Sequence, residues 1–514
     1  MGKLMGRLSL VSSLTLLSRI LGLGRDVLFF SCFGASLIGE AFILAFTFPN
    51  LFRRMLGEGT LSSAFIPVFS DTLRAKSKEK ALFLLNQVTS RLLVFLGLAS
   101  LLVCVLSNYA SGSALLDQAK WAEGLFLNSL SFGYVVLICG SAILVGALNS
   151  TGRFFEGAIS PVVLNLFMIL SMVAGKFIFG LDLPELAVVL CICVMLAGMV
   201  QLLLPWLKLR SSLNWKFRLT FSGSAEMDQI KSLFWVGALG AAVGQINILV
   251  SRFFAYSLDE SGGLSYLFLS SRLVELPLGV FAIAISTVFF PEMARAVSGG
   301  DRFKFLESVH KGLRLTAGIT IPAAVGLAIL AEPILTTLFQ WGEFGKEEVL
   351  DASEILLIAS AGLPFYAIST FLVKVYHSKK RMSLPLQAAV ISLTANLLFS
   401  LFLIGEYKVH GLAWANVLAA MMQTLYLVFR LEEISLKTLL GYQPLHLFTI
   451  LLSAFTMALV IWMAQQLIFI PSNKVENLFY LFLTIPLGLV TYGACLSIFR
   501  FPEARKLIQK FLLR

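Results

Sequence analysis

The chain has 514 residues, of which 58% are hydrophobic and 13% are charged, and its formal net charge is +11. A mean hydropathy of +0.87 lies outside the range of soluble globular proteins. The positive charge therefore does not indicate a soluble protein that binds nucleic acid. It indicates an all-α polytopic membrane protein, because transmembrane strands would show alternating segments of about ten residues instead of long apolar blocks.

Apolar segments of helical length recur along the whole chain. They number about fourteen, and each is close to the roughly 20 residues that a helix needs to cross a bilayer. We predict membrane helices within residues 9–33, 37–56, 83–107, 124–148, 158–179, 185–206, 229–256, 264–292, 315–338, 351–377, 384–404, 411–430, 446–469 and 478–499.

The distribution of basic residues between the loops predicts the orientation. With fourteen helices, the loops rich in Lys and Arg all fall on one side, which identifies that side as cytoplasmic. The basic residues of the opposite loops are only Lys120, Lys176, Lys346, Lys408 and Lys474. An odd number of helices would break this alternation, so we expect both termini in the cytoplasm.

A weak internal repeat predicts two six-helix lobes. The Ser-Arg pair at residues 18–19, followed by Asp26, is echoed by the Ser-Arg pair at 251–252, followed by Asp259. Six helices separate the two copies, so both have the same orientation, as in transporters whose substrate site lies between lobes. The predicted parts are an N-terminal lobe at 1–214, a C-terminal lobe at 215–440, and two further helices with a short amphipathic tail at 441–514.

Charged residues inside the predicted helices need an explanation. A guanidinium near the middle of the membrane costs about 2.5 to 3.5 kcal/mol on insertion scales, so Arg19, Arg25 and Arg272 require a partner or a water-filled cavity. Internal ion pairs are one explanation, joining Arg19 to Asp26 and Arg272 to Glu275. That explanation leaves Arg25 with no close partner in sequence, which favours a cavity that receives an anion.

Other basic residues within the helices lie nearer to helix ends. We expect Arg91, Arg252 and Lys374 to extend their charged groups to the membrane surface.

Motifs for covalent or ATP-driven chemistry are absent from the sequence. It contains no GxxxxGK[ST], HExxH or GxSxG motif. The four histidines lie at or near predicted helix ends, which is typical of surface residues more than of metal ligands. We therefore expect a transporter that carries out no covalent catalysis and binds no cofactor or metal.

Three stretches carry a family resemblance: SRILGLGRD, AFTFPNLFRRMLGEGTLSSAFIPVF and SSRLVELPLGVFAIAISTVFFPEMAR. With them the chain resembles, essentially from end to end, the MurJ (MviN) lipid II flippases of bacterial peptidoglycan synthesis, in the multidrug/oligosaccharidyl-lipid/polysaccharide (MOP) exporter superfamily. The resemblance implies a multi-pass inner-membrane protein that moves lipid II, an undecaprenyl-pyrophosphate-linked disaccharide pentapeptide, to the outer leaflet by alternating access. Its implied partners are lipid II, membrane lipids and other cell-wall synthesis proteins, with no nucleic acid.

The same resemblance implies a central cationic cavity that binds the pyrophosphate. Guanidinium groups suit this ligand because they bind anionic oxygens in pairs. Carried over by motif position, the site residues are Ser18, Arg19, Arg25, Glu40, Arg53, Glu58, Arg272 and Glu275. Glu40 stands where many relatives have Asp, which keeps the charge.

The residues leave the driving force for transport open. Some relatives have an Asp near the position of Ser251 that helps to hold a sodium ion, and this chain has Ser there, which puts sodium coupling in doubt. The membrane potential is an alternative, worth about 2.3 kcal/mol per charge per 100 mV.

Three rival functions remain. Another MOP exporter, either a polysaccharide-lipid flippase or a cation-coupled drug exporter, has the same fold, but a drug-exporter cavity should favour carboxylates and aromatic groups over arginines. A membrane glycosyltransferase needs a catalytic carboxylate on a large external loop. A scaffold that transports nothing has no use for charges inside the bilayer.

Overall fold

The computed structural model describes residues 2–55, 61–112, 119–431, 444–467, 474–499 and 501–502. Within these ranges the chain is helical and has no strand, which confirms the all-α prediction. Ten of the described helices are long and apolar enough to cross a membrane. The count of fourteen crossing helices stays a prediction. The predicted amphipathic tail after residue 502 lies outside the described residues.

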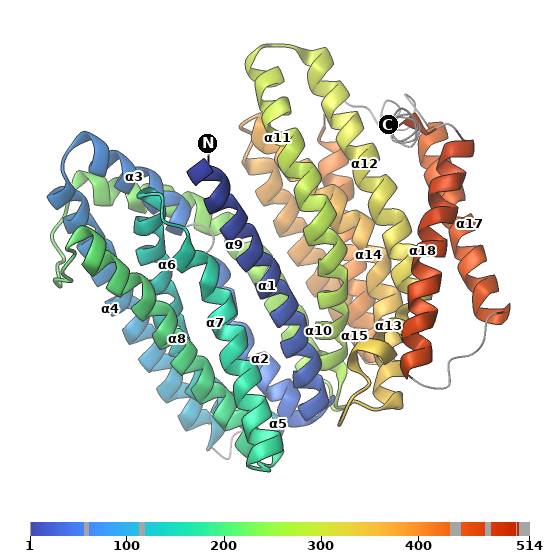
Figure 1. The fold of residues 1–514 in the computed structure, drawn as a ribbon, viewed down its shortest axis with the longest axis horizontal. Helices are drawn as coiled ribbons and strands as arrows, with labels where there is room; N and C mark the ends of the chain where they lie inside the picture. Colours follow the sequence, from blue (N-terminus) through green and yellow to red (C-terminus); the bar gives the residue numbers. More distant parts are fainter. Residues whose placement is uncertain are drawn as a thin grey trace. The chain divides into compact units, whose positions relative to one another are not determined.

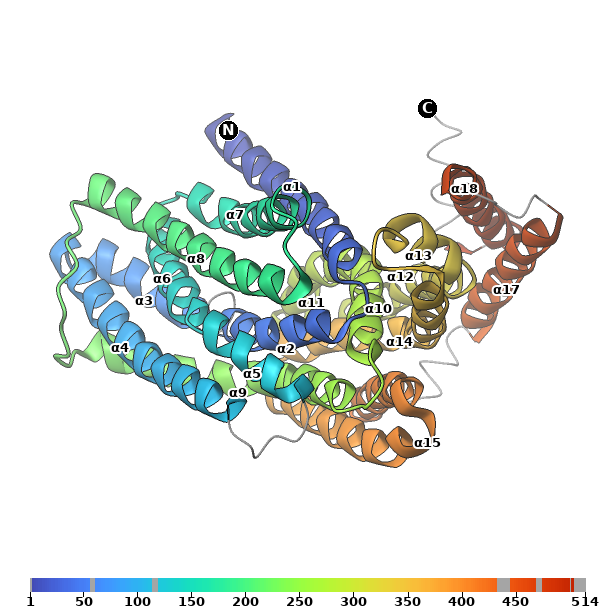
Figure 2. The same ribbon diagram turned by 90° about the horizontal axis from the view of Figure 1, so that it is seen from below.

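The chain forms two compact units. Unit 1 comprises Met1–Leu249 and Trp341–Phe344, and unit 2 comprises Val250–Gln340 and Gly345–Arg514. Unit 1 contains α1 (Gly2–Phe33), α2 (Leu37–Phe52), α3 (Leu61–Ala75), α4 (Lys78–Ser111), α5 (Ala119–Ser131), α6 (Tyr134–Ser150), α7 (Phe155–Met172) with its π-helical extension (Val173–Ile178), α8 (Leu183–Leu213) and most of α9 (Ala225–Tyr256). In this unit α1 packs along α7 and α2 along α5 (Figures 1 and 2).

Polar residues at the helix ends explain why the helices of unit 1 begin where they do. The hydroxyl of Ser36 accepts a hydrogen bond from the backbone N–H of Gly39 and so caps α2. At α8, Asp182 and Glu185 form a reciprocal capping box. Helix α8 ends at Leu213, and the left-handed backbone of the next residue, Asn214 (φ 51°), turns the chain away from the helix axis.

Residues Trp341–Phe344 belong to unit 1, although the residues on both sides belong to unit 2. The backbone N–H of Glu343 donates to the carbonyl of Ser31 at 2.9 Å, and the ring of Phe344 meets that of Phe30 edge to face. Gly342 has a φ of +57°, and a Cβ there would lie 2.2 Å from the Ser31 carbonyl oxygen. This close approach to the end of α1 therefore requires glycine at position 342.

The connection between α8 and α9, residues 214–224, forms a strap that is held by polar side chains of α4. Asn86 accepts from the indole N–H of Trp215 at 2.8 Å. The Arg91 guanidinium donates to the carbonyls of Phe221 and Ser222 at 2.6 and 2.7 Å. Arg91 is thus partly exposed, as expected, and it also binds the strap. Its position near a helix end did not predict this second contact.

Unit 2 is also a helical bundle. It contains the end of α9, then α10 (Gly263–Pro277) with a π-helical turn (Leu278–Ala282), α11 (Ile283–Ser298), α12 (Arg302–Ile329), α13 (Ala331–Phe339), α14 (Lys346–Ser378), α15 (Ser383–Phe429), α17 (Pro444–Leu467) and α18 (Lys474–Ile498). Helix α15 joins two of the predicted segments at Lys408, whose backbone is not helical (φ 47°). Helix α17 packs against both α18 and α12, and the hydroxyl of Tyr492 on α18 donates to the carbonyl of Gly318 on α12.

Candidate functional site

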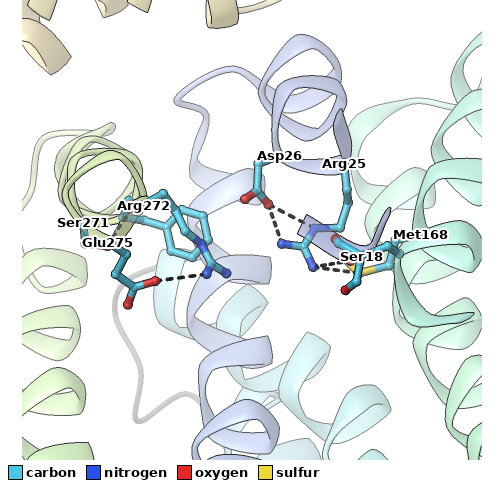
Figure 3. A network of polar contacts seen from close by, with 9 residues as sticks. Ser18, Arg25, Asp26, Met168, Ser271, Arg272 and Glu275 are labelled. Atoms are coloured by element: carbon cyan, nitrogen blue, oxygen red, sulfur yellow. Dashed lines mark hydrogen bonds and ion pairs between the residues drawn. The ribbon is translucent and has the colours of Figure 1, made fainter. Parts of the chain in front are cut away.

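Arg25 in unit 1 is held by an ion pair and an amide. Its guanidinium donates to Oδ1 of Asp26 from Nε at 3.0 Å and from Nη2 at 2.5 Å (Figure 3). Its Nη1 donates to Oδ1 of Asn165 at 3.1 Å. The side chains of Arg25 and Asp26 are only 11% and 12% exposed. The expectation that Arg25 has no close partner in sequence is therefore wrong. Adjacent residues do not face each other on a helix, but the long Arg side chain reaches back to its neighbour.

Asn165 on α7 fixes two turns of α1 at once. Its amide N–H donates to the carbonyl of Ser18 at 3.0 Å, while its amide oxygen accepts from Arg25. Gly22 lies between these two contacts, and a Cβ there would meet the Asn165 amide at 3.5 Å. The signal that would have found Asn165 is a buried amide inside an otherwise apolar segment.

Arg19 lies on the same helix but in a different environment. Its side chain is exposed, and it forms no ion pair within the described parts of the chain. The alternative pairing of Arg19 with Asp26 is therefore wrong, because Asp26 binds Arg25 instead.

Glu40 is completely buried and has a cationic partner. The ammonium of Lys120 lies 2.9 Å from Oε2 of Glu40, with side-chain exposures of 10% and 0%. Helix α2 places Glu40 in its first turn, where the helix dipole also favours a carboxylate. In the sequence Lys120 was only one of the few lysines of the outer loops. The packing of α5 against α2 makes it the counter-ion of a candidate site residue.

Arg53 closes the end of α2. Its Nε and Nη2 donate to Oδ1 of Asn50 at 3.0 and 2.9 Å. Glu58, the remaining candidate of this stretch, lies outside the described residues.

In unit 2, Arg272 contacts Glu275 as predicted. Their side chains lie three residues apart on α10, with Nη1 and Oε2 separated by 3.5 Å (Figure 3). The guanidinium carbon of Arg272 lies 4.9 Å from the centre of the Phe268 ring, and that of Arg252 lies 5.2 Å from the same ring. The sequence predicted neither contact with Phe268, although Arg252 belongs to the second copy of the repeated Ser-Arg pair. Phe268 thus brings two guanidiniums to one ring, whose π face attracts cations.

Ser251, the position at which a sodium site was in question, takes part in a hydrogen-bond network in unit 2. Its hydroxyl donates to Oδ1 of Asn416 at 2.8 Å and accepts from the Asn396 amide at 2.8 Å. The Ser400 hydroxyl donates to Oδ1 of Asn396 at 3.1 Å. These oxygens already take part in hydrogen bonds with one another.

Each unit thus presents guanidinium groups within or beside apolar helices, held by carboxylates, amides or an aromatic ring. Such groups supply oriented, charge-assisted hydrogen bonds to an anion that displaces or shares their present partners.

Comparison with known proteins identifies the family of the chain. A family model described as "Lipid II flippase MurJ" matches residues 29–486. The chain is 32% identical over 492 residues to "Probable lipid II flippase MurJ" of Bdellovibrio bacteriovorus, covering 94% of this chain and 92% of that protein. It is 30% identical over 486 residues to the protein of the same name from Buchnera aphidicola (subsp. Acyrthosiphon pisum), covering 91% and 93%.

Solved structures give the same result. The chain matches "Lipid II flippase MurJ, inward closed conformation" with a TM-score of 0.78 and 28% identity, covering 97% of this chain and 99% of that one. A multidrug resistance MATE family transporter of the MOP superfamily shares the fold at a TM-score of 0.64 and 14% identity, covering 82% and 98%. Since the family model spans most of the chain and the relatives align over nearly their whole length, the chain belongs to the MurJ lipid II flippase family.

Proposed function

We propose that this protein moves lipid II across the bacterial inner membrane, in which it is a multi-pass protein. Family membership supports this, and the observation that carries it is the Arg25 guanidinium, which is nearly buried between two apolar helices and held in a fixed orientation by Asp26 and Asn165. A guanidinium within a membrane helix indicates a function, because an apolar side chain at the same position would insert into the membrane at a much lower free energy.

In this proposal the arginines bind the pyrophosphate. Arg25 and Arg272 each rest on a carboxylate, which keeps the charge in place before the ligand arrives. A pyrophosphate offers several anionic oxygens and can share these guanidiniums, which favours Arg over Lys. Arg19, which is exposed and forms no ion pair within the described residues, needs no exchange of partners to bind it. Lys120 offsets the charge of Glu40 and so keeps a buried carboxylate from repelling the ligand.

Transport would proceed by alternating access between two lobes, residues 1–214 and 215–440, with both termini in the cytoplasm. The fold shared with a MATE family transporter supports this mechanism. The polyprenyl tail would stay in lipid while the headgroup crosses. No covalent catalysis is needed, because the ligand leaves chemically unchanged.

The hydrogen bonds around Ser251 favour a driving force other than a sodium ion at this position. The Asn396 amide donates to the oxygens of Ser251 and Asn416 that a cation would need. We therefore propose that transport is driven by the membrane potential or by an ion bound elsewhere.

Depletion of a native lipid II flippase, with rescue by this chain, tests the function. The unaltered chain should restore growth, whereas Arg19→Ala, Arg25→Ala and Arg272→Ala should reach the membrane without restoring it. Arg210→Ala, at an exposed arginine in the last turn of α8, is the matched control and should rescue fully. Growth with all three site variants would remove the proposed anion site.

Purified protein in vesicles separates the rival transporter functions. A lipid II flippase moves labelled lipid II and ignores cationic dyes, while a drug exporter does the reverse. Replacing Arg25 and Arg272 by Lys should lower the rate of lipid II transport if paired hydrogen bonds matter and leave it unchanged if only charge matters.

A further inference from the structure

Unit 1 contains a pocket of about 320 Å³ away from the arginine site. It is formed by the start of α1, the turn between α6 and α7, and the C-terminal part of α8. Its charged lining residues are Arg153, Glu156 and Lys208.

Glu156 is the unusual member of this pocket. The residue is only 8% exposed, and its Oε2 atom is buried without a hydrogen-bond partner among the described residues. Its place in the first turn of α7 favours a carboxylate through the helix dipole, but a dipole does not satisfy the oxygen. A buried carboxylate oxygen without a donor is costly, and the group that best satisfies it both carries a positive charge and donates a hydrogen.

The same pocket also offers positive groups. Arg153 and Lys208 are exposed, and neither side chain forms an ion pair within the described ranges. A ligand that satisfies both features carries an anionic group for Arg153 and Lys208 and, a short distance away, a cationic donor for Glu156.

The surroundings of the pocket are those of a membrane surface. Phe154 and Phe155 on its rim are 41% and 42% exposed, and Leu10 is 45% exposed. Exposed aromatic side chains beside basic residues are typical of the zone where lipid headgroups meet the hydrocarbon.

We propose that this pocket binds the headgroup of a zwitterionic aminophospholipid. The phosphate contacts Arg153 and Lys208, the primary ammonium donates to Glu156, and the acyl chains leave past Phe154 and Phe155. Phosphatidylglycerol lacks the ammonium and offers Glu156 only neutral hydroxyl donors, whose hydrogen bonds to a carboxylate are weaker than those of a cation. Phosphatidylcholine has a quaternary ammonium without hydrogens to donate. This site serves a membrane lipid and does not depend on the proposed transport of lipid II.

Native mass spectrometry of the full-length protein in detergent tests the proposal. The probes are dioctanoyl phosphatidylethanolamine, phosphatidylglycerol and phosphatidylcholine, with inorganic phosphate as competitor. We expect phosphatidylethanolamine to bind about tenfold more tightly than either other lipid, the effect of roughly one charge-assisted hydrogen bond. Inorganic phosphate should compete only weakly.

Variants separate the two halves of the site. Glu156→Gln should abolish the preference for phosphatidylethanolamine and leave phosphatidylglycerol binding unchanged or stronger. Arg153→Gln should weaken the binding of phosphatidylethanolamine and phosphatidylglycerol to a similar degree. Glu307→Gln, at an exposed glutamate of α12, is the matched control and should change neither.

Equal binding of the three lipids by the unaltered protein would overturn the proposal, as would a Glu156→Gln variant that keeps the preference. Competition by inorganic phosphate at the affinity of the lipid would also overturn it, because the amine would then contribute nothing. If Glu156→Gln does not fold, the comparison of phosphatidylethanolamine with phosphatidylcholine in the unaltered protein decides.

Discussion

Substituting Lys120 by Met removes the cation that lies 2.9 Å from Oε2 of Glu40. Glu40 is fully buried and Lys120 is 10% exposed, so water replaces little of the lost interaction. Breaking a buried ion pair by removing one partner costs about 3 to 5 kcal/mol, because the remaining buried charge loses its counter-ion. We expect Lys120→Met to lower the free energy of unfolding by this amount.

A double-mutant cycle isolates the interaction of the pair. Glu40→Gln combined with Lys120→Met leaves two neutral side chains of similar size. The free energy of unfolding of the double variant should therefore fall by less than the sum of the decreases in the two single variants. We expect a coupling free energy of at least about 1.5 kcal/mol. The assay is unfolding of the four purified proteins by sodium dodecyl sulfate in mixed micelles.

The exposed pair of Lys231 and Asp228 on α9 is the matched control. Its atoms lie 3.0 Å apart, but its side chains are 50% and 71% exposed. A surface pair of this kind contributes about 0 to 1 kcal/mol. If the Glu40 and Lys120 losses add within about 0.5 kcal/mol, the pair does not interact as the geometry indicates and the reasoning is refuted.

Three further predictions concern the scaffold. Arg91→Ala removes two hydrogen bonds to carbonyls of the 214–224 strap, so limited proteolysis should cut the strap faster, and an unchanged cutting rate would contradict this. Gly342→Ala should lower the thermal unfolding midpoint, since its Cβ would lie 2.2 Å from the Ser31 carbonyl oxygen, whereas the control Gly97→Ala, mid-helix with no atom within 4 Å, should leave the midpoint unchanged or raise it. Asp301 caps α12, and the hydrogen bond from the Lys304 backbone N–H lowers the pKa of its carboxyl below the ordinary 3.8. The cap therefore stabilises the ionised form above that value and loses this contribution as the pH falls through the lowered pKa. The stability advantage of the unaltered protein over Asp301→Asn should shrink as the pH falls below 3.8, and an advantage independent of pH would contradict the assignment.

The arginine site was only partly predictable. The pairing of Arg272 with Glu275 follows from helix periodicity, because residues three apart share a face. The contacts of Arg25 with Asn165 and of Glu40 with Lys120 join helices that are distant in the sequence. No local rule brings these residues together, so Lys120 looked like a loop charge and Asn165 attracted no notice.

The sequence alone determined the all-α membrane class, the placement of charge inside the helices and the resemblance to a flippase family, since all three depend on composition, apolar length and motifs that are read along the chain. Only the tertiary structure decided which groups Arg25 and Glu40 meet. A buried charge is stabilised by whatever lies within a few ångströms of it, and that is set by the packing of α1 on α7 and of α2 on α5.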